Sequence, residues 1–207
     1  HGLSPAAAAE FAFVSALAAL ALIDLDTWLL PHALTWPLLA AGILLATSGL
    51  TPAGSFRPAA YGAGVGFAAF AALSWAGEKL LHREVLGFGD VWLLAGIGAW
   101  MGLSALLPIV LLASLQGSVV GLALIALGRA QPGPHPPSRE GARADVPDRD
   151  PGEGDDASAA TQGADDQDWV PPKNAVPFGP FLVLGAVEWL WAGHLLARAV
   201  PALRLFV

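Results

Sequence analysis

Long apolar runs, separated by short polar clusters, dominate this sequence. Four of them contain at most one ionisable residue each, and they cover 5–23, 33–50, 58–77 and 104–128. Runs of this length match the roughly 20 residues that a helix needs to cross the hydrocarbon core of a bilayer. Two further apolar segments cover 91–107, which runs into its successor, and 177–196, which carries Glu188 and His194. The pattern therefore predicts six membrane helices.

Composition agrees with this pattern, since 55% of the residues are hydrophobic and only 13% are charged. We do not expect the first run to be a signal peptide, because no basic segment precedes it and more spans follow it. The fold class that we predict is all-α, a polytopic membrane protein of about six transmembrane helices. The sequence has no cysteine, which excludes disulfides and thiolate metal sites, and we expect no metal or cofactor.

Most of the acidic charge lies in one segment. The formal net charge is −7, and 10 of the 17 acidic residues fall between Arg129 and Lys173. This segment is rich in Pro, Gly, Ala, Ser and Asp and cannot bury enough apolar surface to fold. We therefore expect membrane helices one to five in 1–128, an acidic disordered loop in 129–175 and the last membrane helix with a tail in 176–207. Membrane lipid is an expected partner, and nucleic acid is not.

Two aspartates at helix ends are predicted to face the same side of the membrane. Asp24 ends the first span and Asp90 begins the fourth, so two complete spans lie between them. The same side carries Lys79 and Arg83 in a short loop and five further basic residues in the long loop, whereas the opposite side has three arginines. Positively charged short loops favour the cytoplasm, which predicts a cytoplasmic position for both aspartates.

The neighbours of these aspartates support a site. Asp26 follows Asp24 closely, and Asp90 ends a Gly87-Phe88-Gly89-Asp90 turn, whose glycines permit tight turns and close approach of another chain. Two close carboxylates share a proton, so that one serves as a base and the other as an acid. The base would activate water against a peptide carbonyl, and the acid would protonate the leaving nitrogen. An aspartyl peptidase is the function that this pairing favours.

Three segments together resemble the signatures of bacterial type IV prepilin peptidases, a family of GxGD intramembrane aspartyl proteases. They are DLDTWLLPHALTWPLL from residue 24, GFGDVWLLAGIGAWMG from residue 87 and PFGPFLVLGA from residue 177. The resemblance implies a six-helix protease in the bacterial inner membrane, with prepilin or pseudopilin precursors as substrates. It implies removal of their short basic leader after a glycine, on the cytoplasmic side.

By this resemblance the catalytic pair is Asp24 with Asp90, and Asp26 is a neighbour. The alternative pair, Asp26 with Asp90, stays open. The remaining expected neighbours or substrate-binding residues are His32, Glu84, Gly87, Gly89, Pro177 and Gly179. Two positions depart from the family pattern: His32 stands where Asp or Asn is usual, and Trp92 stands where Lys is usual.

Two other functions stay open. A small proton- or cation-coupled transporter would also use intramembrane carboxylates, although it would need them deeper in the spans. A scaffold that binds pilins without cutting them is the reading that the changes at His32 and Trp92 favour. Many relatives also carry CxxC pairs linked to methylation, and this sequence has none, so we infer peptidase activity for this chain without inferring methylation. Because the sequence opens abruptly at His1, we expect that the native chain is longer.

Polar and glycine positions inside the spans point to helix packing. Gln116 is predicted to join two helices, and Glu188 and His194 to lie near the opposite interface. Three small-xxx-small pairs predict close helix contacts, namely Gly62 with Gly66, Gly98 with Gly102, and Gly117 with Gly121.

Overall fold

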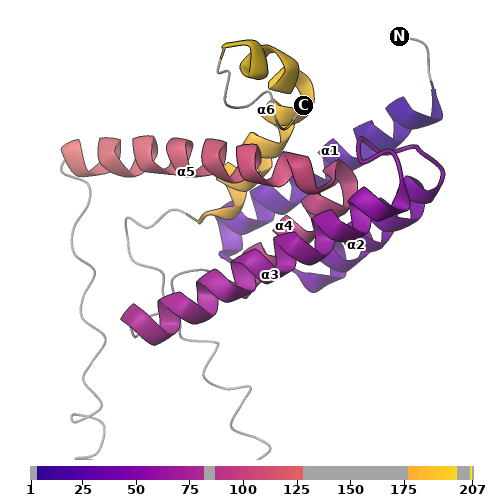
Figure 1. Cartoon of the computed structure of the whole chain (residues 1–207). Coiled ribbons are helices and arrows are strands. Elements are labelled where there is room, and N and C mark those ends of the chain that lie inside the picture. Colours follow the sequence, from indigo (N-terminus) through magenta and orange to yellow (C-terminus); the bar gives the residue numbers. More distant parts are fainter. Residues whose placement is uncertain (1–3, 82–86, 128–176, 200–205, 207) are drawn as a thin grey trace, which may run out of the picture. The chain divides into compact units, whose positions relative to one another are not determined.

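A computed structural model describes residues 4–81, 87–127, 177–199 and 206, and the regular elements in this part of the chain are helices (Figure 1). The six long helices are α1 (Pro5–Thr27), α2 (His32–Thr47), α3 (Phe56–Leu81), α4 (Phe88–Met101), α5 (Leu103–Ala126) and α6 (Gly179–Ala199). Four of them, α1, α3, α5 and α6, are long and apolar enough to cross a membrane, whereas α2 and α4 are shorter apolar helices. The prediction of an all-α polytopic membrane protein is confirmed. The acidic loop predicted for 129–175 lies outside the described residues.

Local sequence explains both ends of α1. The Ser4 side chain accepts a hydrogen bond from the Ala7 backbone N–H at 3.1 Å, and Pro5 follows at the first helical position, where its missing N–H costs nothing. The helix ends at Trp28, which adopts a left-handed conformation with φ 58° and donates its backbone N–H to the Asp24 carbonyl. Asp24 is therefore held in the last helical turn.

The predicted boundary between the fourth and fifth spans was wrong. The structure places α4 at Phe88–Met101 and begins α5 at Leu103, where the sequence pattern indicated 91–107 and 104–128. The reason is Gly102, which has φ 80° and ψ 173°. Glycine adopts this backbone conformation readily, and residues with a side chain rarely do. The Gly102 backbone N–H donates to the Gly98 carbonyl at 2.8 Å and so ends α4. An uninterrupted apolar run thus contains a sharp break.

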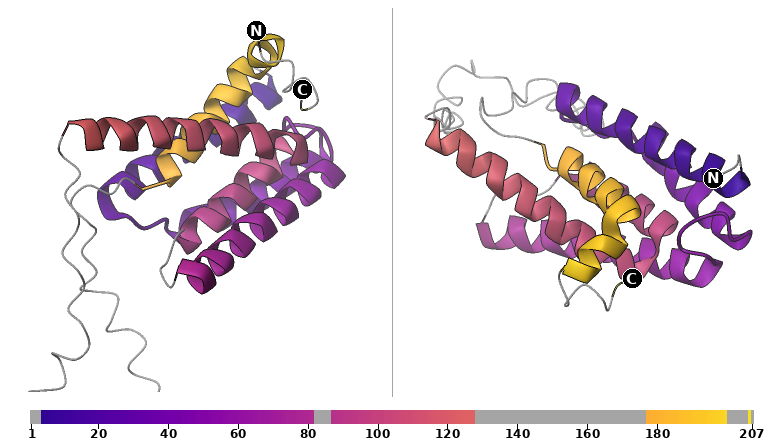
Figure 2. Two further views of the ribbon diagram at one scale, coloured as in Figure 1. Left: turned by 60° about the vertical axis from the view of Figure 1, so that its left-hand side comes forward. Right: turned by 90° about the horizontal axis from the view of Figure 1, so that it is seen from above.

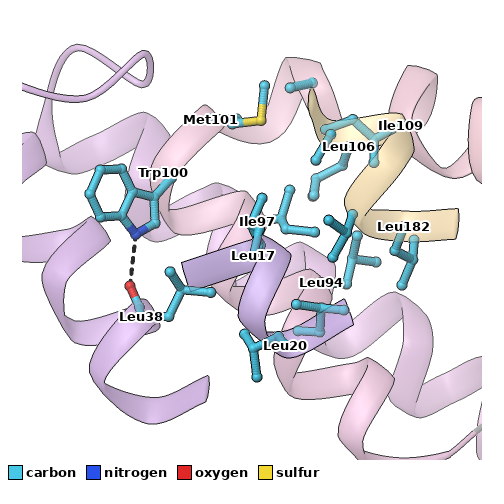
Figure 3. Close-up of a cluster of buried hydrophobic side chains, with 14 of the residues drawn as sticks. Leu17, Leu20, Leu38, Leu94, Ile97, Trp100, Met101, Leu106, Ile109 and Leu182 are labelled. Atoms are coloured by element: carbon cyan, nitrogen blue, oxygen red, sulfur yellow. Dashed lines mark hydrogen bonds between the residues drawn. The ribbon is translucent and has the colours of Figure 1, made fainter. Parts of the chain in front are cut away.

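Helix α4 is the centre of the core. Every described residue from Val91 to Met101 except Trp92 is buried, and α4 contacts α2, α3 and α6. Trp100 shows how these helices interlock, since its indole N–H donates to the Leu38 carbonyl at 2.8 Å (Figure 3). The same ring stacks on Phe13 of α1 with centroids 4.7 Å apart. Helix α6 crosses α5 and runs beside α1 (Figure 2).

Glycines let α3 and α4 approach backbone to backbone. A Cβ atom added at Gly62 would lie 2.8 Å from the Gly98 carbonyl carbon, and one added at Gly66 would lie 2.9 Å from the Leu94 carbonyl oxygen. These contacts confirm the close packing predicted for the glycines of α3. On α5, by contrast, a Cβ at Gly121 would meet nothing within 4 Å.

Replacing Gly98 by alanine is expected to destabilise the fold by about 1–3 kcal/mol, because the new methyl group would overlap the Gly62 backbone. Thermal unfolding in detergent measures this as a lower midpoint. Gly64→Ala is the matched control, since a Cβ there meets nothing within 4 Å and alanine favours a helix over glycine. A Gly98→Ala protein as stable as the control would contradict the packing.

Candidate active site

The last turn of α1 and the first turn of α4 bring Asp24 and Asp90 together. The two side chains are 5% and 7% exposed, and they lie close enough to interact electrostatically. Asp90 is fixed by its backbone N–H, which donates to the Gly87 carbonyl at 3.0 Å. The fold thus buries two carboxylates beside each other.

Gly179, the first residue of α6, lies between these carboxylates. A Cβ atom on Gly179 would collide with Asp24 Oδ2, and it would lie 3.1 Å from Asp24 Cγ and 3.3 Å from Asp90 Oδ1. The backbone N–H of Gly179 also interacts with the Asp24 carboxylate. Because the N-terminal end of a helix carries partial positive charge, α6 offsets part of the negative charge of the pair.

One oxygen of each carboxylate lies beside Gly179 and accepts no hydrogen bond from the described residues. Asp24 Oδ2 and Asp90 Oδ1 are buried and accept no hydrogen bond from the described part of the chain. They are the same two oxygen atoms that a Cβ on Gly179 would approach. Buried acceptors of this kind are costly in a stable fold and need an explanation. Their convergence marks a point where a reacting group would receive two hydrogen-bonding partners.

Leu30 explains why the turn before Asp90 contains Gly89. Leu30 follows α1 and is 7% exposed, and a Cβ on Gly89 would lie 2.7 Å from the Leu30 Cβ. The absence of a side chain at Gly89 therefore lets the turn between α1 and α2 close onto α4. Sequence reasoning missed Leu30, although the glycine beside Asp90 was the available signal.

The other expected site residues fall in different places. Asp26 is exposed, because two residues along a helix turn a side chain by about 200° away from Asp24. Pro177 is half-buried and lies two residues before Gly179, the start of α6. Glu84 lies outside the described residues. The structure therefore brings Asp24, Asp90 and Gly179 together and leaves Asp26 apart from them.

His32 and Trp92, the two departures from the family pattern, meet in space. Their ring centroids lie 6.4 Å apart, and Trp36 lies 5.9 Å from His32 and 5.8 Å from Trp92. Phe67 and Phe88 contact the Trp92 ring as well. This aromatic cluster joins α2, α3 and α4 at the end of α4 that carries Asp90. The sequence pattern did not indicate that these rings belong together.

The described residues contain no group of three or more His, Cys, Asp or Glu side chains that could hold a metal ion. What the site offers is a pair of oxygen acids and a helix N-terminus. This arrangement is suited to moving protons between carboxylates and a bound molecule.

The family model of the type IV leader peptidases matches residues 11–122, which include both aspartates and more than half of the chain. The chain belongs to the type IV leader peptidase family. A prepilin leader peptidase/N-methyltransferase of Myxococcus xanthus is 39% identical over 91% of this chain and 63% of its own length. A protein of the same description from Stutzerimonas stutzeri is 35% identical over 99% of this chain and 56% of its own.

A third such relative, from Aeromonas salmonicida, is 45% identical over 54% of this chain. The chain thus spans less than two thirds of the length of each of these relatives. No solved structure matches it.

Removing one of the buried carboxylates is expected to stabilise the protein. In alkaline buffer, where both carboxylates are ionised, Asp90→Asn relieves the like-charge repulsion and the cost of a buried charge, so we expect a gain of about 1 kcal/mol and a midpoint about 2–4 °C higher. Thermal unfolding in detergent measures the shift. Asp26→Asn, a change at an exposed carboxylate, should leave the midpoint in place. Equal shifts for both variants would argue against a buried pair.

Proposed function

We propose that this protein is an intramembrane aspartyl endopeptidase that removes the short basic leader from type IV prepilins and pseudopilins. The observation that carries the proposal is the convergence of Asp24 Oδ2 and Asp90 Oδ1 on Gly179. Membership of the type IV leader peptidase family and the descriptions of its relatives support it. We place the cut after a glycine at the cytoplasmic face of the bacterial inner membrane, as the charge pattern of the loops predicts.

The chemistry follows from a proton shared between Asp24 and Asp90. The ionised carboxylate takes a proton from a water molecule, whose oxygen then attacks the scissile carbonyl carbon. The protonated carboxyl group donates to the substrate, and the C–N bond breaks when the leaving nitrogen receives a proton. The dyad is thereby returned to its starting state with one proton, because the water supplied one proton and one hydroxyl group.

Gly179 gives the substrate room to reach the dyad. A peptide bond must lie beside both carboxylates, and a side chain at Gly179 would occupy that place. A peptide must also be extended at this point, since a helix hides its carbonyls in internal hydrogen bonds. The non-helical backbone at Pro177 and Phe178, before α6, suits such a substrate, because irregular backbone within a membrane protein is tolerated where it lines a cavity.

The two rival functions receive less support. A transporter would need carboxylates near the middle of the spans, whereas Asp24 lies in the last turn of its helix and Asp90 in the first. A non-cleaving scaffold would keep its substrate contacts without needing two buried acids beside each other.

Cleavage of a purified prepilin in liposomes tests the proposal. We expect the parent protein to cut at the leader glycine and Asp24→Asn or Asp90→Asn to lower the rate by at least about 10³-fold, since each variant removes a group required for proton transfer. Asp26→Asn, the matched carboxylate on the same helix, should retain activity. Loss of activity in Asp26→Asn instead of Asp24→Asn would assign the pair to Asp26 and Asp90. A folded parent protein that never cuts would leave the scaffold or the transporter as the function.

Gly179→Ala is expected to abolish cleavage while the helices stay folded, because the added methyl group would occupy the position shared by the two carboxylate oxygens. The measurement combines the cleavage rate with thermal unfolding. Gly121→Ala is the control for a glycine-to-alanine change in a membrane helix, since a Cβ there meets nothing within 4 Å. Full activity in Gly179→Ala would show that the substrate does not pass beside this residue.

A further inference from the structure

One face of α6 carries a stripe that the proposed chemistry does not use. Its members follow one another at spacings of three and four residues, and they are Phe181, Leu184, Glu188, Trp191 and Leu195. Leu184, Trp191 and Leu195 are 48%, 65% and 54% exposed. This spacing is that of a helix face that packs along a second helix. We call these five residues the α6 stripe.

Glu188 is the one acidic residue of the α6 stripe, and it bonds to α5. Gln116 Nε2 donates to Glu188 Oε2 at 2.6 Å, and both side chains are half-buried. Gln116 Oε1 is buried and receives no hydrogen bond from the described residues. The pair therefore offers more acceptor oxygens than donors. On α5 the neighbouring Val119 and Val120 are exposed, so apolar surface surrounds the pair on both helices.

The Gln116–Glu188 pair differs from polar pairs that only hold two helices together. Such pairs face the interior, where the donors of one side chain match the acceptors of the other. Here the carboxylate lies in the middle of an exposed apolar stripe, and an ionisable group inside a membrane is costly unless it has a partner or a task. Gln116 supplies a donor for one oxygen of the Glu188 carboxylate, and lipid tails offer none for the other, so a helix of another polypeptide is a suitable source of a second donor.

The α6 stripe continues directly from the site. A Cβ atom added at Gly117 of α5 would lie 3.6 Å from the Phe181 ring, and Phe181 lies two residues after Gly179, which lies beside both aspartates. Glu188 follows Gly179 by nine residues, which corresponds to about 13 Å along a helix. A helix that lay along the α6 stripe would therefore have one end beside the dyad.

We propose that the α6 stripe binds the transmembrane helix of the substrate and that Glu188, with Gln116, accepts a hydrogen bond from a donor side chain on that helix. A polar position in an otherwise apolar helix contact fixes the register of the two helices. Register along α6 decides which peptide bond reaches Asp24 and Asp90, so Glu188 acts as a positioning residue for the cut. This inference rests on the proposed peptidase function.

Kinetics with two substrates tests the register. One is a full-length prepilin in liposomes, and the other is a water-soluble peptide that contains the leader and only a few residues after the glycine. For Glu188→Leu and Gln116→Leu we expect KM for the full-length substrate to rise at least tenfold and mass spectrometry to show additional cut positions. The short peptide does not reach Glu188, so its kinetics should change less than twofold. Glu188→Gln keeps an acceptor oxygen, so its KM for the full-length substrate and its cut position should stay close to those of the parent protein.

His194→Leu is the matched control, because it replaces an exposed polar residue of α6 outside the stripe. It should leave the kinetics of both substrates unchanged. Equal losses for the long and the short substrate would assign Glu188 a purely structural role and overturn the inference. Unchanged kinetics and cut position for the full-length substrate would overturn it as well.

Photo-crosslinking separates this inference from the proposed function. A photoreactive phenylalanine at Trp191, introduced together with Asp90→Asn, is expected to capture the membrane helix of the prepilin. Capture without cleavage by the parent protein would support the docking surface and reject the peptidase. Cleavage without capture would reject the docking surface, and capture of a second copy of this chain in place of prepilin would make the stripe a dimer contact.

Discussion

Two carboxylates, those of Asp24 and Asp90, are held side by side in a place where few polar groups can compensate them, and the arrangement of the helices follows from this requirement. Each carboxylate is more than nine-tenths buried, and each has one oxygen that accepts no hydrogen bond from the described residues. The N-terminus of α6 is the compensating element, because the Gly179 backbone N–H interacts with the Asp24 carboxylate. Three helix ends, distant in the sequence, must therefore meet at one point.

Close packing around α4 makes this meeting rigid. Glycine contacts bring α3 against α4, and Trp100 joins α4 to α1 through Phe13 and to α2 through the Leu38 carbonyl. At the site end, Leu30 packs onto Gly89 and fixes the turn that precedes Asp90. A dense core tolerates little displacement, so the core keeps the two carboxyl groups beside each other. The stability of the core offsets the cost of the site.

Much of the fold and part of the site could be predicted from the sequence. Apolar runs predict membrane helices because lipid excludes unpaired backbone groups, and counting two spans between Asp24 and Asp90 places them on one side. The break at Gly102 was missed, since an apolar run carries no mark of a backbone turn within it. The position of Gly179 between the carboxylates, and the contact between His32 and Trp92, depend on how distant helices are rotated against each other. No periodicity along one helix reports that rotation.

The central claim is that one reacting group binds between Asp24 Oδ2 and Asp90 Oδ1 beside Gly179. A structure in lipid with a bound peptide analogue, whose scissile bond is replaced by a hydroxyl-bearing carbon, tests this most directly. We predict that the hydroxyl group lies within hydrogen-bond distance of both oxygens and that the peptide is extended past the start of α6. A hydroxyl group bound by Asp26, or an analogue bound away from Gly179, would contradict the account.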